Sequence, residues 1–444
     1  MTHSDLLAVA AVIFAAVVLL TLLGLCKPFV NGSEGLRKLA HLGTGGLAFL
    51  FPWLFSSLPP VLLVCGLALL LLTAVSSIPS VRSRLGGSLY AVERRSRGEF
   101  YFPISVALLF FLAHGDRLLY LIPLLVLTFA DAVASVLGTV YGKVAYEGIG
   151  GTKSLEGSVA FFTVAFFAVH VPLLLFTELS RPQSLLVALD IALVVTLLEA
   201  VAWRGQDNII IPLGVFLLLH IYTAMPVRFL IVRFIAASVL LVFVMLYRSR
   251  TTLQASALLA SALVLYASWG VGGWPWLVAP AVLFICYSLF LPGKLPTTVR
   301  KDTTYAVTSV ASAGLFWLYI SVLRGNQSQI FPYTVAYTIH LAILGWTLRC
   351  LVVPEQSVLR RGPILVIQCW VLMFVPYLCM QPFSNATLWQ AALALPACGL
   401  PFGIFCFFEP RYQGLYEVNG WRWVRQAVLV FVLTAPLSLF GGTQ

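Results

Sequence analysis

The sequence predicts an all-α, polytopic integral membrane protein with about sixteen transmembrane helices. Of its 444 residues, 60% are hydrophobic and only 10% are charged, whereas soluble domains carry roughly 25% charged residues. Apolar runs recur along the whole chain, and a helix satisfies its own backbone hydrogen bonds in lipid. The eight cysteines form no CxxC pair and lie mostly in apolar runs, so we expect small buried side chains rather than a zinc site or disulfides.

The apolar runs fall into eight candidate spans in each half of the chain. The first run has no basic stretch before it and no small-residue cleavage site after it, so we expect a retained helix rather than a signal peptide. The fourth run is short for a helix that needs about 20 residues to cross a bilayer. The expected spans are 6–25, 39–56, 60–78, 101–114, 118–140, 157–177, 184–201, 209–225, 227–247, 252–270, 274–291, 305–323, 332–350, 362–381, 387–408 and 424–440.

Lysines and arginines are distributed unevenly over the loops between these spans. In the first half, the loops after odd-numbered spans carry eleven of them, and the loops after even-numbered spans carry three. Basic loops stay in the cytoplasm, so we expect the N-terminus outside and the polar clusters on the cytoplasmic side. The membrane would be a bacterial inner membrane or an organelle membrane. This distribution also accounts for the net charge of +11 without nucleic acid as a partner.

The polar residues divide the chain into two predicted domains. Residues 1–225 hold carboxylates inside or beside predicted spans, so we expect a membrane catalytic domain there. Residues 226–444 form a second membrane helical domain, whose role the sequence leaves open. The two roles considered for this domain are to line the access route of a lipid and to support a homodimer. Its many small residues suit close helix packing. Its acidic residues are all expected in loops: Asp302, Glu355, Glu409 and Glu417.

One stretch, from Asp131 to Gly157, carries the strongest signal of function. Asp131 lies inside a predicted span, where a carboxylate is costly and usually functional. It shares one helical face with Ser135 and Gly138, and this small polar face suits a cavity. The following loop, GIGGTKSLEGS, offers close backbone approach and a lysine to an anion such as phosphate. It lacks the GxxxxGK[ST] spacing of a P-loop, and an ordinary glycine-rich turn is the alternative.

Three further polar clusters are expected on the same cytoplasmic side. The second span begins with Arg37, Lys38 and His41. These side chains either contact phosphate or carboxylate, or they only hold the helix at the membrane surface. Arg37 and His41 share a helical face because they are four residues apart. Glu99 lies where the fourth span begins. The last cluster is in and after the seventh span and comprises Glu199, Asp207 and Asn208.

In this order, these motifs resemble the membrane polyprenol kinase family, which includes phytol kinase, dolichol kinase and CTP-dependent diacylglycerol kinase. The matching segments are RKLAHLG (37–43), GEF (98–100), DAVASVLG (131–138), GK (142–143), TKSLEG (152–157), Glu199 and DNIIIP (207–212). The resemblance covers residues 30–220, about half of the chain. It implies transfer of a phosphoryl group from a nucleoside triphosphate, commonly CTP, to a lipid alcohol such as phytol, farnesol or dolichol.

The resemblance also implies roles for individual residues. Asp131 and Asp207 would bind Mg²⁺ or Mn²⁺, a hard cation that accompanies nucleotide phosphates. Lys153 would hold phosphates, and Glu156 would fix Lys153 or add a metal contact. Glu99 and Glu199 are candidates for a general base, although phosphoryl transfer does not strongly need one. The nucleotide-binding set would be Arg37, Lys38, His41, Ser135, Gly138, Lys143, Gly150, Gly151, Thr152, Ser154, Gly157 and Asn208.

Two other classes of function are open from the sequence. A CDP-lipid synthase also uses CTP at a membrane, but it transfers a cytidylyl group to a phosphatidate. A transporter with an intramembrane carboxylate would have two eight-helix halves. The second half, however, has no counterparts of Asp131 and Lys153, and no internal repeat is evident.

Overall fold

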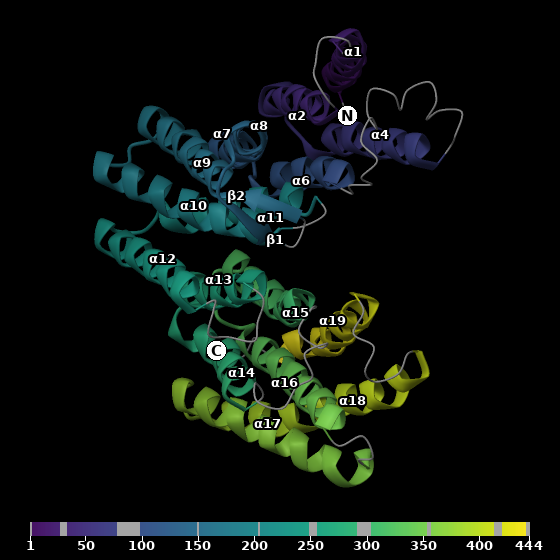
Figure 1. The fold of residues 1–444 in the computed structure, drawn as a ribbon, viewed down its shortest axis with the longest axis vertical. Helices are drawn as coiled ribbons and strands as arrows, with labels where there is room; N and C mark the ends of the chain where they lie inside the picture. The colour runs from purple at the N-terminus through teal and green to yellow at the C-terminus, as the bar shows by residue number, and fades with distance from the viewer. Residues whose placement is uncertain are drawn as a thin grey trace. The chain divides into compact units, whose positions relative to one another are not determined.

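The computed structural model describes residues 2–26, 33–77, 98–148, 151–202, 205–247, 255–290, 303–352, 357–412 and 420–440. Contacts between Cα atoms divide the chain into two units, Met1–Ser238 and Val239–Gln444 (Figure 1). The division falls inside the helix α12 (Val227–Tyr247). The boundary expected at residue 225 lies just before this helix.

The described part of unit 1 is helical except for one short hairpin and one π-helical turn. The elements before the hairpin are α1 (His3–Cys26), α2 (Ser33–Phe49), α3 (Phe51–Leu54), α4 (Leu58–Ser77), α6 (Gly98–Leu112), α7 (Arg117–Leu125), the π-turn η1 (Val126–Ala130) and α8 (Asp131–Tyr141). The hairpin and the helices after it are β1 (Ala145–Gly148), β2 (Gly151–Ser154), α9 (Leu155–Phe176), α10 (Arg181–Val201), α11 (Asp207–Tyr222) and α12.

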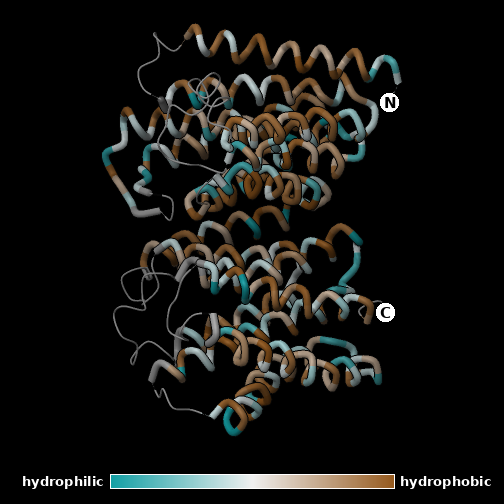
Figure 2. The backbone as a smooth tube through the Cα atoms, turned by 90° about the vertical axis from the view of Figure 1, so that its right-hand side faces the viewer, coloured by the Kyte–Doolittle hydropathy of each residue, from teal (hydrophilic) through white to brown (hydrophobic). Residues whose placement is uncertain are grey.

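Most of these helices have the length and composition of membrane spans, as the apolar stretches of the tube in Figure 2 show. Among the described residues, ten helices are long and apolar enough to cross a bilayer, and four more are apolar but shorter. The integral membrane class is therefore confirmed, whereas the count of sixteen spans is not. The second expected span is divided into α2 and the short α3, because Pro52 in the first turn of α3 has no N–H to continue a helix. The fourth is α6, which has 15 residues.

Residues 145–148 and 151–154 pair as the strands of a β-hairpin where a glycine-rich loop was expected. Strands β1 and β2 pair antiparallel in the register Ala145↔Ser154, Tyr146↔Lys153, Glu147↔Thr152 and Gly148↔Gly151. Directly opposed residues point to the same face of a hairpin, so Tyr146 and Lys153 share one face. Gly151, whose backbone was expected to hold phosphate, lies in this ladder opposite Gly148. The loop expectation failed because two four-residue strands give too short an alternation to read from sequence.

A close approach of α8 and α9 fixes the base of the hairpin. A Cβ atom added at Gly157 would lie 3.1 Å from the carbonyl oxygen of Ala134 and 3.2 Å from the Cα of Gly138. Ser154 is the N-cap of α9, and its hydroxyl accepts a hydrogen bond from the Gly157 N–H at 3.2 Å. The same hydroxyl donates to the carbonyl of Gly138 at 3.4 Å. Three residues implied as nucleotide ligands, Gly138, Ser154 and Gly157, thus pack α8 against α9.

Replacing Gly157 by valine is expected to force α8 and α9 apart and to destabilise the protein by about 1–3 kcal/mol, the usual cost of overpacking. The measurement is the thermal unfolding midpoint of the purified protein in detergent. The matched control is Gly66→Val in α4, because a Cβ atom at Gly66 would meet nothing within 4 Å. If the unfolding midpoint shifts equally in both variants, the close approach of α8 and α9 at Gly157 is not the cause of the destabilisation.

The π-helical turn η1 immediately precedes Asp131. Such turns are rare and frequently occur at functional sites. Thr128 of this turn is fully buried, and a Cβ atom added at Gly45 of α2 would overlap its side chain. Helix α2 therefore lies directly against the turn, and this contact brings the polar residues of α2 beside Asp131.

Unit 2 has a hydrophobic core of its own, centred on α16. Its elements are α13 (Ala255–Gly272), α14 (Trp274–Phe290), α15 (Thr303–Leu323), α16 (Ile330–Val352), α17 (Val358–Met380), α18 (Asn385–Tyr412), α19 (Gly420–Thr434) and the short 3-10 helix η3 (Ala435–Phe440). Glu409 was expected in a loop but lies buried in α18. Its carboxylate accepts hydrogen bonds from Arg425 of α19 at 3.1 and 2.5 Å, and this pairing offsets the cost of burying the charge in a helix.

Candidate active site in unit 1

An ion pair between α2 and α8 forms one side of the site. Lys38 Nζ donates to Asp131 Oδ2 at 2.7 Å and lies 3.4 Å from the backbone carbonyl of Asp131. The side chain of Lys38 is 6% exposed and that of Asp131 is 18% exposed. The lysine is therefore enclosed, whereas the carboxylate it holds is still reachable from outside.

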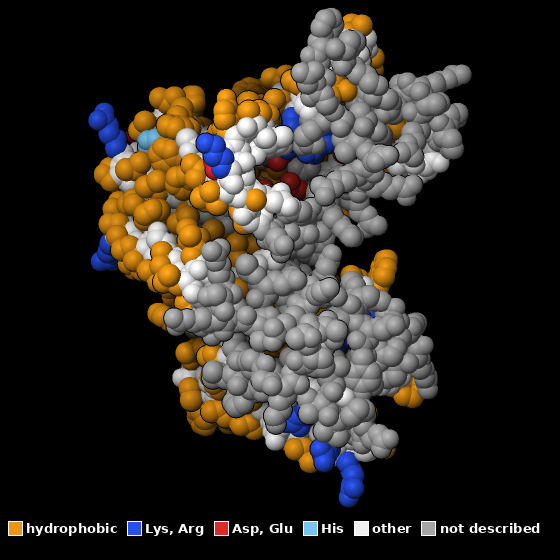
Figure 3. Space-filling view, in the orientation of Figure 1, with side chains coloured by type: hydrophobic (Ala, Val, Ile, Leu, Met, Phe, Trp, Pro, Cys, Tyr) orange, Lys and Arg blue, Asp and Glu red, His pale blue; other side chains and the backbone are white. Residues whose placement is uncertain are grey.

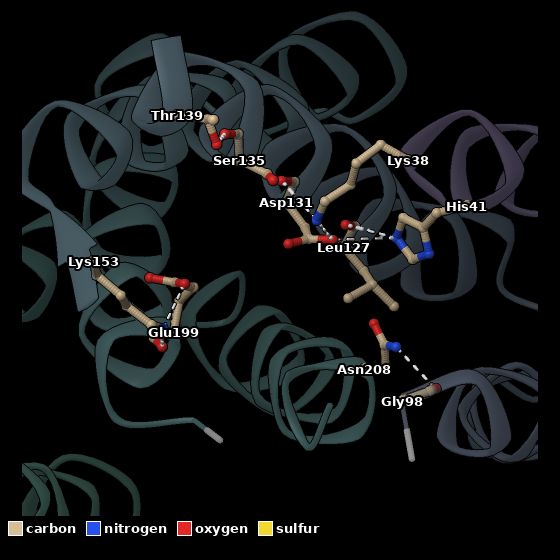
Figure 4. Close-up of polar contacts among 10 residues, drawn as sticks. All are labelled: Lys38, His41, Gly98, Leu127, Asp131, Ser135, Thr139, Lys153, Glu199 and Asn208. Carbon is tan, nitrogen blue, oxygen red and sulfur yellow. Dashed lines mark hydrogen bonds and ion pairs between the residues drawn. The ribbon is translucent and has the colours of Figure 1, made fainter. Parts of the chain in front are cut away.

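Two further side chains of α2, His41 and Arg37, interact with Asp131. His41 Nε2 is 3.8 Å from Asp131 Oδ2 and 3.4 Å from the carbonyl oxygen of Leu127. The ring of His41 packs edge-on against Phe102 of α6, with centroids 5.5 Å apart. Arg37 interacts electrostatically with both His41 and Asp131. The structure thus brings all three polar residues that open α2 to the same carboxylate, as Figure 4 shows for two of them.

A second ion pair joins the hairpin to α10. Lys153 Nζ donates to Glu199 Oε1 at 2.6 Å and also to the backbone carbonyl of Glu199. Glu156, which was expected to fix Lys153, accepts the backbone N–H of Val144 with both carboxylate oxygens at 3.3 Å. It does so because it lies in the first turn of α9, facing the chain that leaves α8. The described residue that fixes Lys153 is Glu199, whose Oε1 and backbone carbonyl both accept from the lysine.

Asp207, the first residue of α11, connects the two ion pairs electrostatically. Its carboxyl interacts with the charges of Asp131, Lys38, Lys153 and Glu199. One of its oxygens, Oδ1, is buried and has no hydrogen-bond partner in the described part of the chain. Figure 4 shows the two ion pairs on opposite sides of one space, and Figure 3 shows acidic side chains deep in a hollow with basic ones at its edge. A buried carboxylate without a partner is costly, so this position suits a cation.

One residue expected in the site, Asn208, holds α11 against α6 instead. Asn208 Nδ2 donates to the carbonyl of Gly98 at 2.9 Å, and the carbonyl of Asn208 accepts from Ser105 Oγ at 2.5 Å. Glu99 lies in the first turn of the same helix, α6, and is half-buried. Asn208 thus fixes the start of α11, and with it the position of Asp207, rather than presenting its amide to a ligand.

The remaining expected ligands lie on α8 and in the hairpin region. Ser135 is half-buried one turn after Asp131, and its carbonyl accepts a hydrogen bond from Thr139 Oγ1 at 2.7 Å. Lys143 and Thr152 are exposed. Gly150 lies outside the described residues.

Tyr146 is a site residue that the sequence analysis missed. Its hydroxyl is hydrogen-bonded to Ser158 Oγ at 2.7 Å, and it stands opposite Lys153 in the hairpin. Burial raises the pKa of the Tyr146 phenol, the Ser158 hydrogen bond opposes this, and the nearby charge of Glu199 adds to it. The phenol therefore stays protonated at neutral pH. Two strands of only four residues give an alternation too short to reveal this pairing from the sequence.

The residues present fit a magnesium ion that arrives with its nucleotide. The described residues contain no group of three or more His, Cys, Asp or Glu side chains that could hold a metal alone. Mg²⁺, however, is usually bound through one or two carboxylates together with waters and substrate phosphates. Asp131 and Asp207 supply such carboxylates, and Arg37, Lys38 and Lys153 supply positive charge for phosphates.

Comparison with known proteins identifies one informative relative. The chain is 31% identical over 208 residues to a phytol kinase from a Synechocystis species, and the match covers 46% of this chain and 86% of that protein. No family model matches the chain, and no solved structure matches it.

Proposed function

Because this chain belongs to the phytol kinase-like family of membrane lipid-alcohol kinases, we propose that unit 1 transfers a phosphoryl group from CTP to an isoprenoid alcohol such as phytol, farnesol or dolichol. The observation that supports this most directly is Asp207, whose buried oxygen without a partner lies in the field of two lysine–carboxylate pairs. Such a site has the charges that phosphoryl transfer requires, namely cations around phosphates and carboxylates for a metal.

In this proposal the two lysines have different roles. Lys153 is fixed in place by Glu199 and contacts the donor phosphates, whereas Lys38 keeps Asp131 in position. Asp131 and Asp207 would hold Mg²⁺ (or Mn²⁺), which neutralises charge on the phosphates during transfer. The bond from the transferred phosphorus to its bridging oxygen breaks, the alcohol oxygen bonds to phosphorus, and the hydroxyl proton is released. Glu199 is engaged by Lys153, so Glu99 is the better candidate for any base.

The location of the site suits one water-soluble and one lipid-soluble substrate. Asp207 lies in the first turn of α11, Lys38 lies in the second turn of α2, and Glu199 lies in the last turn of α10. Charged groups at helix ends lie near the membrane surface, where a nucleotide can reach them, while the alcohol chain stays among apolar helices. From the basic loops we place this surface on the cytoplasmic side.

The proposal is tested with membranes that contain the full-length protein. They receive Mg²⁺, CTP labelled at the γ-phosphate or in the cytidine, and phytol, farnesol, dolichol or diacylglycerol, and the organic phase is analysed. We expect the γ-phosphate label in a lipid monophosphate and no cytidine label. Cytidine label in the lipid would show a CDP-lipid synthase instead, and no label in any lipid would contradict a kinase. ATP, UTP and GTP in parallel reveal the preferred donor.

Replacing Lys153 by methionine is expected to lower kcat/KM for the nucleotide roughly 10- to 150-fold, because a hydrogen bond to a charged group contributes about 1.5–3 kcal/mol. KM for the alcohol should stay unchanged. The control is Arg181→Met, which removes an exposed positive charge at the other end of α10. A loss confined to the alcohol's KM would place Lys153 on the lipid side of the site.

A further inference from the structure

Four helices of unit 2 enclose a cavity that the proposed chemistry does not use. Helices α13, α14, α15 and α16 line this cavity, which is partly open to the surface of the unit. Its lining is mainly aliphatic and aromatic and includes Val264, Leu283, Phe284, Val307 and Leu344. An apolar chain would therefore be well solvated by these side chains.

The polar groups of the cavity are hydroxyls. Of its described lining residues, Ser261, Tyr287 and Tyr337 are polar and none is charged. An ionised phosphate in such a place would have no counter-charge among these described residues, and burying an unpaired charge costs far more than burying a hydroxyl. The lining therefore selects an uncharged head group and rejects a phosphorylated one.

Tyr337 provides a specific partner for that head group. Tyr337 is 2% exposed, and its hydroxyl interacts with that of Tyr333 but makes no hydrogen bond of good geometry in the described part of the chain. The neighbouring Tyr333, with ring centroids 4.9 Å apart, already donates to the carbonyl of Trp276 at 2.6 Å. A buried hydroxyl without a partner is unfavourable, so an acceptor placed beside Tyr337 would be bound.

Ser261 complements Tyr337 as an acceptor. Its hydroxyl donates to the carbonyl of Ala257 at 2.9 Å, which uses its proton but leaves lone pairs on the oxygen. An alcohol is both a donor and an acceptor, so it can satisfy Tyr337 and Ser261 together. A ketone or an ester could satisfy only Tyr337.

The cavity is also reachable for a chain that is dissolved in the bilayer. Leu283, Phe284 and Val307 are half-buried rather than enclosed, so the lining extends to the surface of the unit. That surface is apolar: Ile285, next to Phe284 on α14, is 50% exposed. A lipid can therefore enter laterally from the hydrocarbon region without crossing a polar layer.

We propose that this cavity binds the uncharged isoprenoid alcohol, with its hydroxyl at Tyr337 and Ser261, and excludes the phosphorylated form. The identity of the alcohol as an isoprenoid rests on the proposed function, whereas the selection for a neutral single-chain alcohol rests on the cavity alone. The site would thus hold the unphosphorylated substrate and not the product, which gives the second unit a role in the same reaction.

The test uses a photoreactive analogue of a C20 isoprenoid alcohol and the monophosphate of the same analogue. Each is irradiated with purified full-length protein, and the labelled peptides are identified by mass spectrometry. We expect the alcohol to label peptides from residues 255–352 at least about 10-fold more strongly than the monophosphate. Equal labelling by both compounds, or no labelling in this region, would overturn the proposal.

Three variants sharpen the result. Val307→Trp fills the cavity and should abolish this labelling, whereas Ile285→Trp, an exposed position on α14, should leave it unchanged. Tyr337→Phe keeps the ring and removes one hydrogen bond, so labelling should fall about 2- to 10-fold. Unchanged labelling in Tyr337→Phe and in Val307→Trp would overturn the assignment, provided that both variants keep the elution profile of the native protein.

The same labelling in the Asp131→Asn variant separates this proposal from the proposed function. Labelling of residues 255–352 should persist there, because no residue of the cavity belongs to unit 1. A protein that binds the alcohol in this cavity but phosphorylates none would contradict the kinase proposal alone. A protein that phosphorylates the alcohol but is labelled only in residues 1–238 would contradict the cavity proposal alone.

Discussion

Replacing Asp131 by asparagine is expected to reduce phosphorylation of the lipid alcohol by at least about 100- to 1,000-fold, the usual effect of removing one group that stabilises charge in a transition state. Asparagine keeps the size of the side chain but cannot offer a charged ligand to Mg²⁺ or pair with Lys38 at 2.7 Å. The measurement is the initial rate of lipid monophosphate formation in membranes with equal amounts of each protein.

Asp190 provides a matched control for this experiment. It is also a carboxylate inside a long apolar helix, α10, and it is fully buried. The positive charge that acts on Asp190 is that of Arg233 in α12, and Asp190 is not among the charges that act on Asp207. Asp190→Asn should therefore retain the native rate. Native activity in Asp131→Asn would refute both the metal and the phosphate role of Asp131.

Replacing Lys38 by methionine is expected to destabilise the protein by about 3–5 kcal/mol, because it leaves a largely buried carboxylate without its ion-pair partner. Methionine fills nearly the same volume, so the effect reports the charge rather than a cavity. The measurement is the thermal unfolding midpoint of the purified protein, with Lys143→Met as the control for removing an exposed lysine.

The double variant Lys38→Met with Asp131→Asn separates stability from activity. Removing both charges of a buried pair is often nearly neutral, so most of the lost stability should return. Activity should remain low, because the carboxylate is still missing. If the double variant is as unstable as Lys38→Met alone, the interaction between these two side chains is not what stabilises α2 against α8.

Features that depend on composition or on one helix could be predicted from the sequence. The membrane class follows from hydropathy, and Asp131 is noticeable because carboxylates are rare in apolar helices. Arg37, Lys38 and His41 could be grouped because residues three and four apart lie on one side of a helix. The structure places all three beside Asp131.

Features that depend on contacts between distant segments could not be predicted. Lys153 and Glu199 are far apart in the chain, and only the packing of α9 on α10 brings them together, so Glu156 was the nearer but incorrect partner. The π-helical turn before Asp131 has no local sequence signal, because its residues are as apolar as their neighbours. Glycines 138 and 157 suited phosphate as well as helix packing, and the sequence does not distinguish these uses.

The hairpin restricts how the length of this segment can vary among natural or engineered versions of the chain. Strand residues alternate between two faces, so one residue inserted or deleted between Gly151 and Ser154 would turn Lys153 to the face of Glu147 and Thr152. The lysine would then point away from Glu199, even though every residue of the motif was still present. Insertions or deletions within a strand should therefore preserve function only when they change its length by an even number of residues. A chain that carries the same motif with an odd change of strand length should be inactive.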